Sequence, residues 1–425
     1  MPYQTAVTVQ AALPPDRVAE VRELLREAGR KSTAGGELFP FAEIPGIHFA
    51  RVVLVPEGPG GVAADMPPSV VYMSEVDGSV EAHLAELVRE ARDGLDRVFG
   101  YCAGYPAGGS PDTARSDWLR AHVVPCAAFY VNTVGRGRQQ IEQEALLREV
   151  IEEFLDRNGP ALAGRSPVEI RAAVQEYVGG REDLAWARTG PAPPPLGLRI
   201  RRAAHLVGVP LAAVGLLPLL VTALPAWVVL LRLHERRDVP DHARPSHDRI
   251  RELAGREDFG AQNPFTAVGS VKAGPFRRIT LTTVLFVVDY GVRHVFDRGN
   301  LAGVKTIHFA RWLFIDGKRR VIFASNYDGS LESYMDDFID KVAWGLNAVF
   351  SNGLGFPRVR WLVLDGARDE QAFKNYLRCH QVPTQVWYSA YDTSTAHDLD
   401  INARIRAGLF GHLGPAETEA WLALF

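Results

Sequence analysis

The sequence predicts a mixed α+β protein made of two tandem copies of one unit, with an uncharged apolar segment inserted between them. Three blocks recur in the same order and at similar spacing. Residues 46–51 (GIHFAR) return as 306–311 (TIHFAR), 74–81 (SEVDGSVE) as 325–332 (SNYDGSLE), and 119–125 (LRAHVVP) as 377–383 (LRCHQVP). Such self-similarity over three blocks indicates a duplicated domain.

Hydrophobic periodicity predicts the order strand, helix, strand, strand, helix, strand in each copy. The first copy has predicted strands 5–12, 47–56, 69–74 and 125–132, a helix beginning at 14 and a helix 79–99. The second has strands 265–273, 307–315, 320–325 and 383–391, and helices 277–296 and 330–350. The order βαββαβ is the ferredoxin-like unit, which leaves one sheet face bare, so two copies are expected to pack sheet to sheet. We divide the chain into repeat 1 (1–158), an insert (159–262) and repeat 2 (263–425).

The insert begins with a predicted helix at 166–179 that has a capping box, and a proline-rich linker at 191–195 follows. Residues 206–231 then carry no charge, and arginines lie on both sides of them. The run exceeds the roughly 20 residues that a helix needs to cross a bilayer, so a membrane segment is expected at about 203–231. Because basic residues mark the cytoplasmic side, a hairpin or in-plane monotopic anchor is favoured over a single transmembrane span.

The composition restricts the class of protein. With 47% apolar and 23% charged residues the chain is globular, and a net charge of −3 argues against a nucleic-acid partner. Three cysteines without paired spacing predict neither a disulfide framework nor a thiolate metal site, and no cleaved signal peptide is expected. We therefore expect a protein on the cytoplasmic face of a bacterial-type inner membrane, in contact with membrane lipid.

The predicted topology resembles the dimeric α+β barrel superfamily, which includes cofactor-free monooxygenases, chlorite dismutases and dye-decolourising peroxidases. Asp77 and Asp328, each followed by Gly-Ser, resemble the GxxDG element of the peroxidases, although Ser74 and Ser325 stand where the leading glycine belongs. The resemblance implies a haem cofactor, for which His380, His397 and His294 are nominal ligands. The alternative is that each Asp or Ser caps the helix that follows it.

The comparison of the two copies suggests a site in repeat 2. This copy has gained polar and aromatic side chains where copy one has others: Trp312 for Val52, Asn326 for Glu75, Tyr327 for Val76, Gln385 for Ala127 and Trp387 for Phe129. A pocket with a few placed polar groups needs such residues. The alternative is simple drift between the copies.

Within this site, His308 or Tyr327 is predicted to transfer a proton, while Arg311, Asn326 and Trp387 bind the ligand. Strand alternation predicts that His308, Ala310, Trp312 and Phe314 share one sheet face. A structural role for His308 is the alternative, because His48 occupies the same position in copy one. His122 and His380 precede the last strands in matching contexts and predict a shared turn.

Two functions are compatible with these patterns. The first is a membrane-associated protein that binds an apolar or lipid-derived small molecule in the duplicated barrel, with an oxidoreductase of the haem or cofactor-free kind as one form. The second is a non-catalytic membrane-bound scaffold. No Walker loop, dinucleotide fingerprint or hydrolase elbow is found in the sequence, which disfavours nucleotide-dependent and α/β-hydrolase chemistry.

Overall fold

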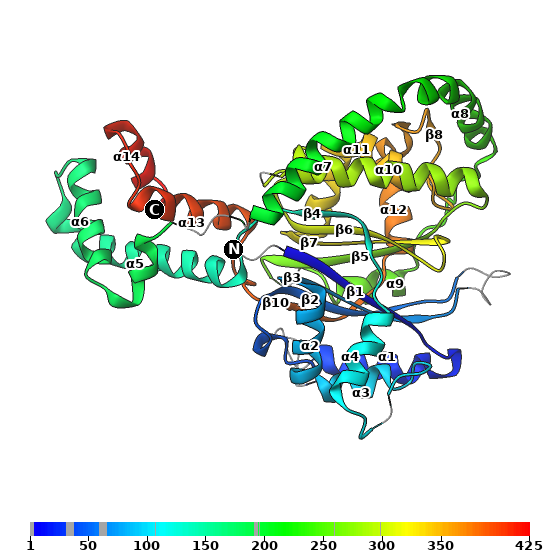
Figure 1. Cartoon of the computed structure of the whole chain (residues 1–425), viewed down its shortest axis with the longest axis horizontal. Helices are drawn as coiled ribbons and strands as arrows, with labels where there is room; N and C mark the ends of the chain where they lie inside the picture. The colour runs from blue at the N-terminus through cyan, green and yellow to red at the C-terminus, as the bar shows by residue number, and fades with distance from the viewer. Residues whose placement is uncertain are drawn as a thin grey trace.

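The computed structural model describes residues 4–30, 38–58, 66–106, 108–190, 194, 196–258, 260–297 and 299–425. The chain is a mixed α+β protein with antiparallel sheets, as the sequence predicts (Figure 1). The predicted linker at 191–195 lies outside the described residues except for Pro194.

Two four-stranded sheets form the centre of the molecule. The N-sheet has the order β1-β3-β2-β10, and the C-sheet has the order β4-β6-β7-β5. The N-sheet strands are β1 (Gln4–Ala12), β3 (Ser69–Asp77), β2 (Ile47–Val55) and β10 (Thr384–Ser389). The C-sheet strands are β4 (Cys126–Val131), β6 (Ile307–Ile315), β7 (Arg320–Asp328) and β5 (Gln262–Ser270).

The two halves of the chain exchange their last strands. β10 pairs with β2, and β4 pairs with β6, so each sheet holds three strands of one half and one strand of the other. Before it crosses, each exchanged segment touches the first strand of its own half: the N–H of Val124 donates to Thr8 O (2.9 Å) and that of Val382 to Thr266 O (2.8 Å). A self-contained βαββαβ unit would leave the edges of β2 and β6 unpaired. The exchange pairs both edges and joins the two sheets.

Helices cover the outer face of each sheet (Figure 1). The N-sheet carries α1 (Val18–Arg30), α2 (Val80–Glu90), α3 (Arg92–Phe99) and α4 (Asp112–Ala121). The C-sheet carries α10 (Pro275–His294), α11 (Leu331–Phe350) and α12 (Glu370–His380). The helix predicted at 79–99 is interrupted at Ala91, whose backbone angles (φ −112°, ψ 25°) are not helical.

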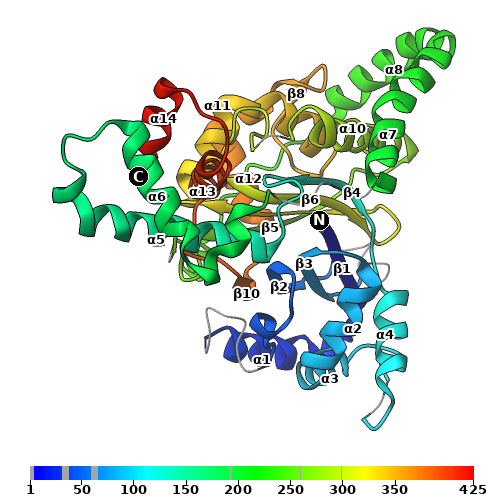
Figure 2. The same ribbon diagram turned by 60° about the vertical axis from the view of Figure 1, so that its left-hand side comes forward.

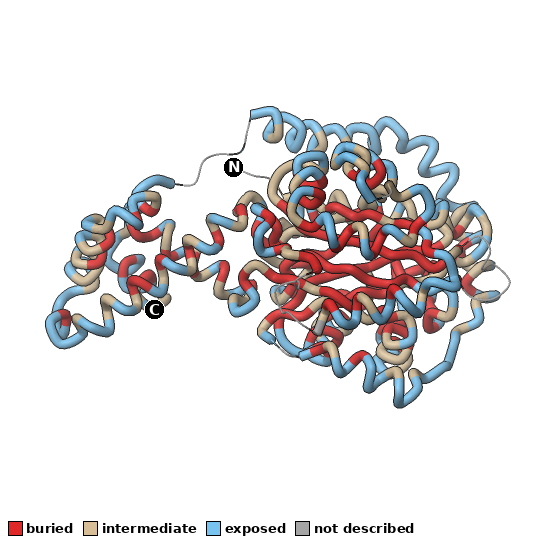
Figure 3. The backbone as a smooth tube through the Cα atoms, turned by 90° about the horizontal axis from the view of Figure 1, so that it is seen from below, coloured by how far each residue is buried: buried red, intermediate tan, exposed pale blue. Residues whose placement is uncertain are grey.

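Apolar side chains fill the space between the sheets at one end. Val53, Val55, Val71 and Met73 of the N-sheet form one cluster with Leu313, Ile315, Ile322 and Ala324 of the C-sheet. The inner faces of the two sheets therefore pack on each other, and the burial-coloured backbone shows the sheets as mostly buried (Figure 3). The remaining short elements are a separate two-stranded hairpin, β8 (Val359–Arg360) with β9 (Leu364–Asp365), and the 3₁₀ turns Pro15–Arg17, Phe41–Glu43 and Gly366–Arg368.

A helical lobe lies at one end of the barrel (Figure 1, left). It consists of α5 (Arg138–Leu162), α6 (Pro167–Gly179), the 3₁₀ turn Glu182–Arg188, α13 (Ala396–Leu409) and α14 (Pro415–Leu422). Their apolar residues form a core of their own. The predicted capping box is present: Ser166 N donates to Glu169 Oε2 (2.8 Å) and Glu169 N donates to Ser166 Oγ (3.4 Å).

The rest of the insert forms α7 (Leu196–Gly215), α8 (Leu217–Arg237) and α9 (His247–Ala254). The uncharged run is therefore two helices that meet at Leu216, next to Gly215 and Pro218. Figure 2 shows the pair at the periphery, outside α10. Among the described residues, α8 is the one helix long and apolar enough to cross a membrane.

Candidate functional site

Arg311, a predicted ligand-binding residue, reaches from the C-sheet into the N-sheet. It is 0% exposed. One terminal nitrogen donates to Val7 O (2.7 Å) and to Thr8 Oγ1 (2.9 Å), and the other donates to Ser74 O (2.6 Å) and forms an ion pair with Glu75 Oε1 (2.6 Å). The guanidinium thus fastens one sheet to the other.

Arg51 makes the reciprocal connection from the N-sheet. Its Nη1 donates to Phe265 O (2.8 Å) and to Thr266 Oγ1 (3.0 Å), and its Nη2 donates to Ser325 O (2.9 Å) and to the side-chain oxygen of Asn326. Of this set the patterns in the sequence predict Asn326 but not Arg51, although the repeated HFAR block contains both arginines. The same residue type at the same position of each copy points to contacts between the copies.

The two connections differ in charge. Glu75, opposite Arg311, carries a carboxylate, whereas Asn326, opposite Arg51, is neutral. Two hydrogen bonds join the connections: Asn326 Nδ2 donates to Glu75 Oε2 (3.4 Å), and Trp387 Nε1 donates to Asn326 Oδ1 (3.2 Å). Burial lowers the pKa of Arg51 to about 10, which Glu75 counteracts. The structure therefore does bring Arg311, Asn326 and Trp387 together, but as members of one buried network that uses their polar atoms internally.

His308 lies where the register between β6 and β7 shifts by one residue. This bulge ends the strict alternation, so His308 does not share a face with Trp312 as predicted. Its ring lies 5.4 Å from that of Phe49 in the N-sheet, and its Nε2 lies 2.6 Å from Asp328 Oδ1. Because His308 is 1% exposed, a substrate has no direct path to it.

His48 repeats this arrangement in the first half. The β2–β3 register shifts at the same point, His48 Nε2 lies 3.0 Å from Asp77 Oδ1, and its ring lies 5.4 Å from that of Phe309. One difference remains: Tyr391 Oη lies 2.9 Å from His48 Nδ1, while His308 Nδ1 has no partner among the described residues. Burial holds the pKa of Tyr391 well above its usual range, so the phenol stays neutral.

The two aspartates connect the barrel to the helical lobe. Asp328 Oδ2 accepts from Ala396 N (2.7 Å), the first residue of α13, and Asp77 Oδ2 accepts from Arg138 N (2.8 Å), the first residue of α5. The predicted capping of the following helices belongs instead to serines: Ser330 accepts from Ser333 N, and Ser79 does the same in α2. The expectation that an Asp or Ser caps each following helix is therefore met by the serines, and the expectation that Asp328 itself caps α11 is wrong. Asp328 accepts from the first amide of α13, a helix distant in sequence whose N-cap is Thr395.

Tyr327 lies on the opposite face of the C-sheet from Asn326. Its ring stacks on Tyr334 with a centroid distance of 4.0 Å, in the core beneath the covering helices, and its hydroxyl has no partner among the described residues. Neighbouring residues of a strand point to opposite faces. The two side chains therefore do not line one pocket, and burial raises the pKa of Tyr327 above its usual range, which opposes a role in proton transfer.

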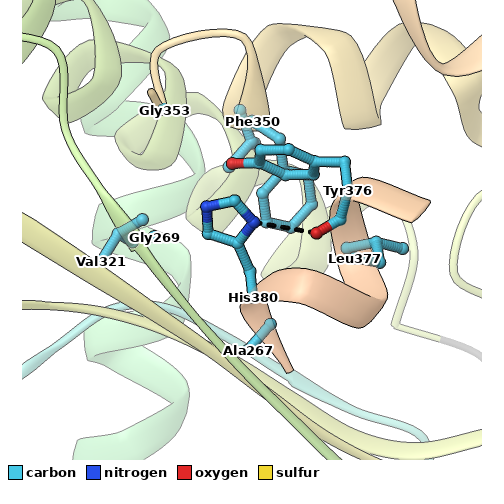
Figure 4. Close-up of a pocket in the computed structure, with 9 residues that line it drawn as sticks. Ala267, Gly269, Val321, Phe350, Gly353, Tyr376, Leu377 and His380 are labelled. Carbon is cyan, nitrogen blue, oxygen red and sulfur yellow. Dashed lines mark hydrogen bonds between the residues drawn. The ribbon is translucent and has the colours of Figure 1, made fainter. Parts of the chain in front are cut away.

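His380 borders a small apolar cavity (Figure 4). Its Nδ1 lies 2.8 Å from Tyr376 O and its ring packs on Tyr376, just as His122 Nδ1 lies 2.8 Å from Trp118 O and packs on Trp118. The shared turn predicted for the two histidines is thus present. The cavity has a volume of about 10 Å³, room for one water at most, so this cavity cannot hold a haem. His380 also lines the larger groove described next.

A larger groove lies at the barrel end where β2 and β5 finish. It has a volume of about 820 Å³ and is lined by apolar and charged residues of both halves, including Arg22, Asp241, Arg249 and Cys379. Gln385, which is 7% exposed, also lines it and accepts from Leu54 N (3.1 Å). Its size lies within the range of small-molecule sites.

The most unusual surface belongs to α7 and α8. α7 has no buried residue, and α8 buries only Leu231 and Glu235, near its end. The exposed large apolar residues are Leu196, Ile200, Leu206, Val207, Leu211 and Val214 of α7 and Leu217, Leu219, Leu220, Val221, Leu224, Val229, Leu230 and Leu233 of α8. Figure 3 shows the pair as a continuous exposed stretch. Soluble proteins rarely expose so large an apolar patch without a partner for it.

Comparison with protein families, curated proteins and solved structures finds no match to this chain. Among the described residues, no group of three or more His, Cys, Asp or Glu side chains is arranged to hold a metal ion.

Proposed function

We propose that the chain is a membrane-associated protein that attaches through α7 and α8. The observation that carries this proposal is the exposed, uncharged surface from Leu206 to Leu230. Transfer of such apolar area from water into lipid is favourable by roughly 25 cal/mol for each Å². Arginines at both ends of the run favour the cytoplasmic face of a bacterial-type inner membrane, since basic residues are retained on that side.

The barrel is proposed to consist of two tandem ferredoxin-like repeats, related to the dimeric α+β barrels. The common order of the first three strands in each half, the reciprocal Arg51 and Arg311 contacts and the two His–Asp pairs support this relationship. Because the halves exchange strands, both must lie on the same side of the membrane.

The interior of the barrel supports the scaffold function more than the ligand-binding one. Arg311, Asn326 and His308 are at most 1% exposed, and protein groups occupy most of their polar atoms. We therefore assign the barrel a structural role and propose no oxidoreductase step. A second candidate is binding of an apolar or lipid-derived small molecule in the groove, which the volume of about 820 Å³ favours.

Vesicle flotation of the full chain tests membrane association. The parent protein should float with the vesicles, while Leu211→Asp/Leu220→Asp should stay in the aqueous fraction with unchanged circular dichroism. Leu146→Asp/Val168→Asp is the matched control, because these side chains are also about half exposed but lie on the helical lobe. Equal flotation of all three proteins would exclude attachment through this surface.

Native mass spectrometry tests the second candidate. Cys379→Trp would fill part of the groove, since Cys379 is exposed on its lining. If the groove holds a lipid-derived molecule, a mass bound to the parent protein should be lost from this variant. If the variant retains the bound mass, the molecule binds elsewhere on the protein. If neither protein carries a bound mass, the ligand-binding candidate is wrong and the scaffold function remains.

A further inference from the structure

We infer that α7, α8 and α10 together form a wedge that enters a single leaflet of an anionic phospholipid bilayer and does not cross it. This inference rests on the proposed membrane association and adds its topology, its depth and the charge of its lipid partner. It depends on three features: the fixed bases of the two helices, the free length between them, and the side chains around the wedge.

The base of α7 is attached to the C-terminal end of α10. Tyr290 Oη donates to Leu206 O (2.9 Å), and His205 Nδ1 lies 2.7 Å from His294 Nε2. Arg202 donates to Arg293 O (3.2 Å) and forms an ion pair with Asp297. The free part of α7 therefore begins after Leu206.

The base of α8 is attached to the N-terminal end of α10 and to the β8–β9 hairpin. Trp227 Nε1 donates to Thr280 Oγ1 (3.2 Å). Glu235, only 5% exposed, accepts from Trp361 N (3.1 Å) and Leu362 N (2.7 Å), and the Arg232 guanidinium lies 4.7 Å from the centre of the Trp361 ring. The free part of α8 therefore ends before Trp227.

The free lengths decide between insertion and crossing. At 1.5 Å per residue, the segments 207–215 and 217–226 extend about 13.5 and about 15 Å. The hydrocarbon core is roughly 30 Å thick, so each arm matches one leaflet. α8 as a whole, from Leu217 to Arg237, is about 31 Å long and could cross, but only if its last turns left the protein and took Arg232 and Glu235 into lipid. The existing contacts of Arg232 and Glu235 with the β8–β9 hairpin oppose this movement.

The surroundings of the wedge match a lipid surface with negative charge. Between the two bases, α10 exposes Ile279, Phe286 and Val287, at 64%, 51% and 62%. Exposed arginines adjoin the two bases in sequence, Arg199 and Arg201 in the first turns of α7 and Arg236 and Arg237 at the end of α8, and none of them has an ion-pair partner among the described residues. An apolar floor bordered by free guanidinium groups fits the acyl region and the phosphate groups of one leaflet.

Site-specific probes on the full chain test the topology. In a Cys379→Ser background, which removes the exposed native cysteine, a cysteine introduced at Leu216, Gly197 or Val239 carries an environment-sensitive fluorophore, and Gly159→Cys serves as the control on the helical lobe. The background protein without an introduced cysteine gives the labelling of Cys102 and Cys126, which is subtracted. Each protein is added to preformed vesicles of phosphatidylcholine with phosphatidylglycerol. Nitroxide lipids labelled at shallow or deep acyl positions report depth, and external dithionite reports which side each probe occupies.

A one-leaflet wedge predicts deep quenching at Leu216 and full dithionite access at both flanks, Gly197 and Val239. Protection of one flank probe would show a crossing helix and overturn this inference, while membrane association itself would stand. A Leu216 probe that no lipid nitroxide quenches, on a protein that stays off the vesicles, would refute the proposed function as well. If the apolar surface instead binds a second copy of the chain, the protein off the vesicles will sediment as a dimer.

Discussion

Replacement of Arg311 tests whether the barrel interior is structural. Arg311→Met removes an ion pair and three hydrogen bonds at a fully buried position and leaves the Glu75 carboxylate without its closest cation. Breaking a buried pair by removal of one partner costs about 3–5 kcal/mol. We expect the free energy of unfolding in urea, followed by circular dichroism and tryptophan fluorescence, to fall by this amount.

The partner variant and a control make this test specific. Glu75→Gln should destabilise by a similar amount, because it leaves two buried arginines without an anion. The double variant Arg311→Met/Glu75→Gln should lose less than the sum, by about 0.5–3 kcal/mol of coupling. Arg157→Met also removes an arginine from an ion pair, with Glu153, but at a side chain that is 66% exposed, and it should change stability by less than about 1 kcal/mol. If Arg311→Met unfolds at the same urea concentration as Arg157→Met, the interior is not the connection described here.

Three further predictions address the membrane surface, a buried histidine and the lobe connection. Arg236→Gln should weaken binding to anionic vesicles at low ionic strength by about 1 kcal/mol, roughly fivefold, with no change on neutral vesicles and none for Arg157→Gln. Burial lowers the pKa of His83 from 6.5 to about 3, so between these pH values the unfolded chain binds a proton at this histidine and the native protein does not. The free energy of unfolding should therefore fall as the pH drops from 6.5 to 3, by up to about 5 kcal/mol, and His83→Tyr should flatten that dependence. Asp328→Asn should speed amide exchange at the start of α13, and Asp77→Asn should do the same at the start of α5. Each change should lower the free energy of unfolding by about 1–2 kcal/mol, because the carboxylate accepts a hydrogen bond from the first amide of that helix.

Local patterns in the sequence were sufficient to predict most elements. The predicted strand 307–315 coincides with β6 (Ile307–Ile315), and the predicted strand 69–74 lies within β3 (Ser69–Asp77). The exchange of β4 and β10 could not be predicted this way. A strand has the same periodicity whichever neighbour it pairs with, so its partner is decided by the stacking of the two sheets, which is a contact distant in sequence.

The predicted site shows a different limit. Alternation alone would have separated Asn326 from Tyr327, since neighbours on a strand face opposite sides. The position of His308 could not be derived from alternation, because a bulge depends on pairing with β7. The predicted set also lacked Arg51 and Glu75, which complete the network. Arg51 is identical to its counterpart in the second half, so a site predicted from differences between the halves does not include it.

Residues that recur in the matching sequence blocks make matching contacts in the structure. Each of the two repeated arginines lies in one sheet and donates hydrogen bonds to the other. Arg51 and Arg311 make such reciprocal contacts, and the paired histidines lie against each other's neighbouring phenylalanines. The repeated arginines therefore connect the two sheets. The segment with no counterpart in either copy, α7 and α8, carries the exposed apolar surface, and the distinctive function of the chain is best sought there.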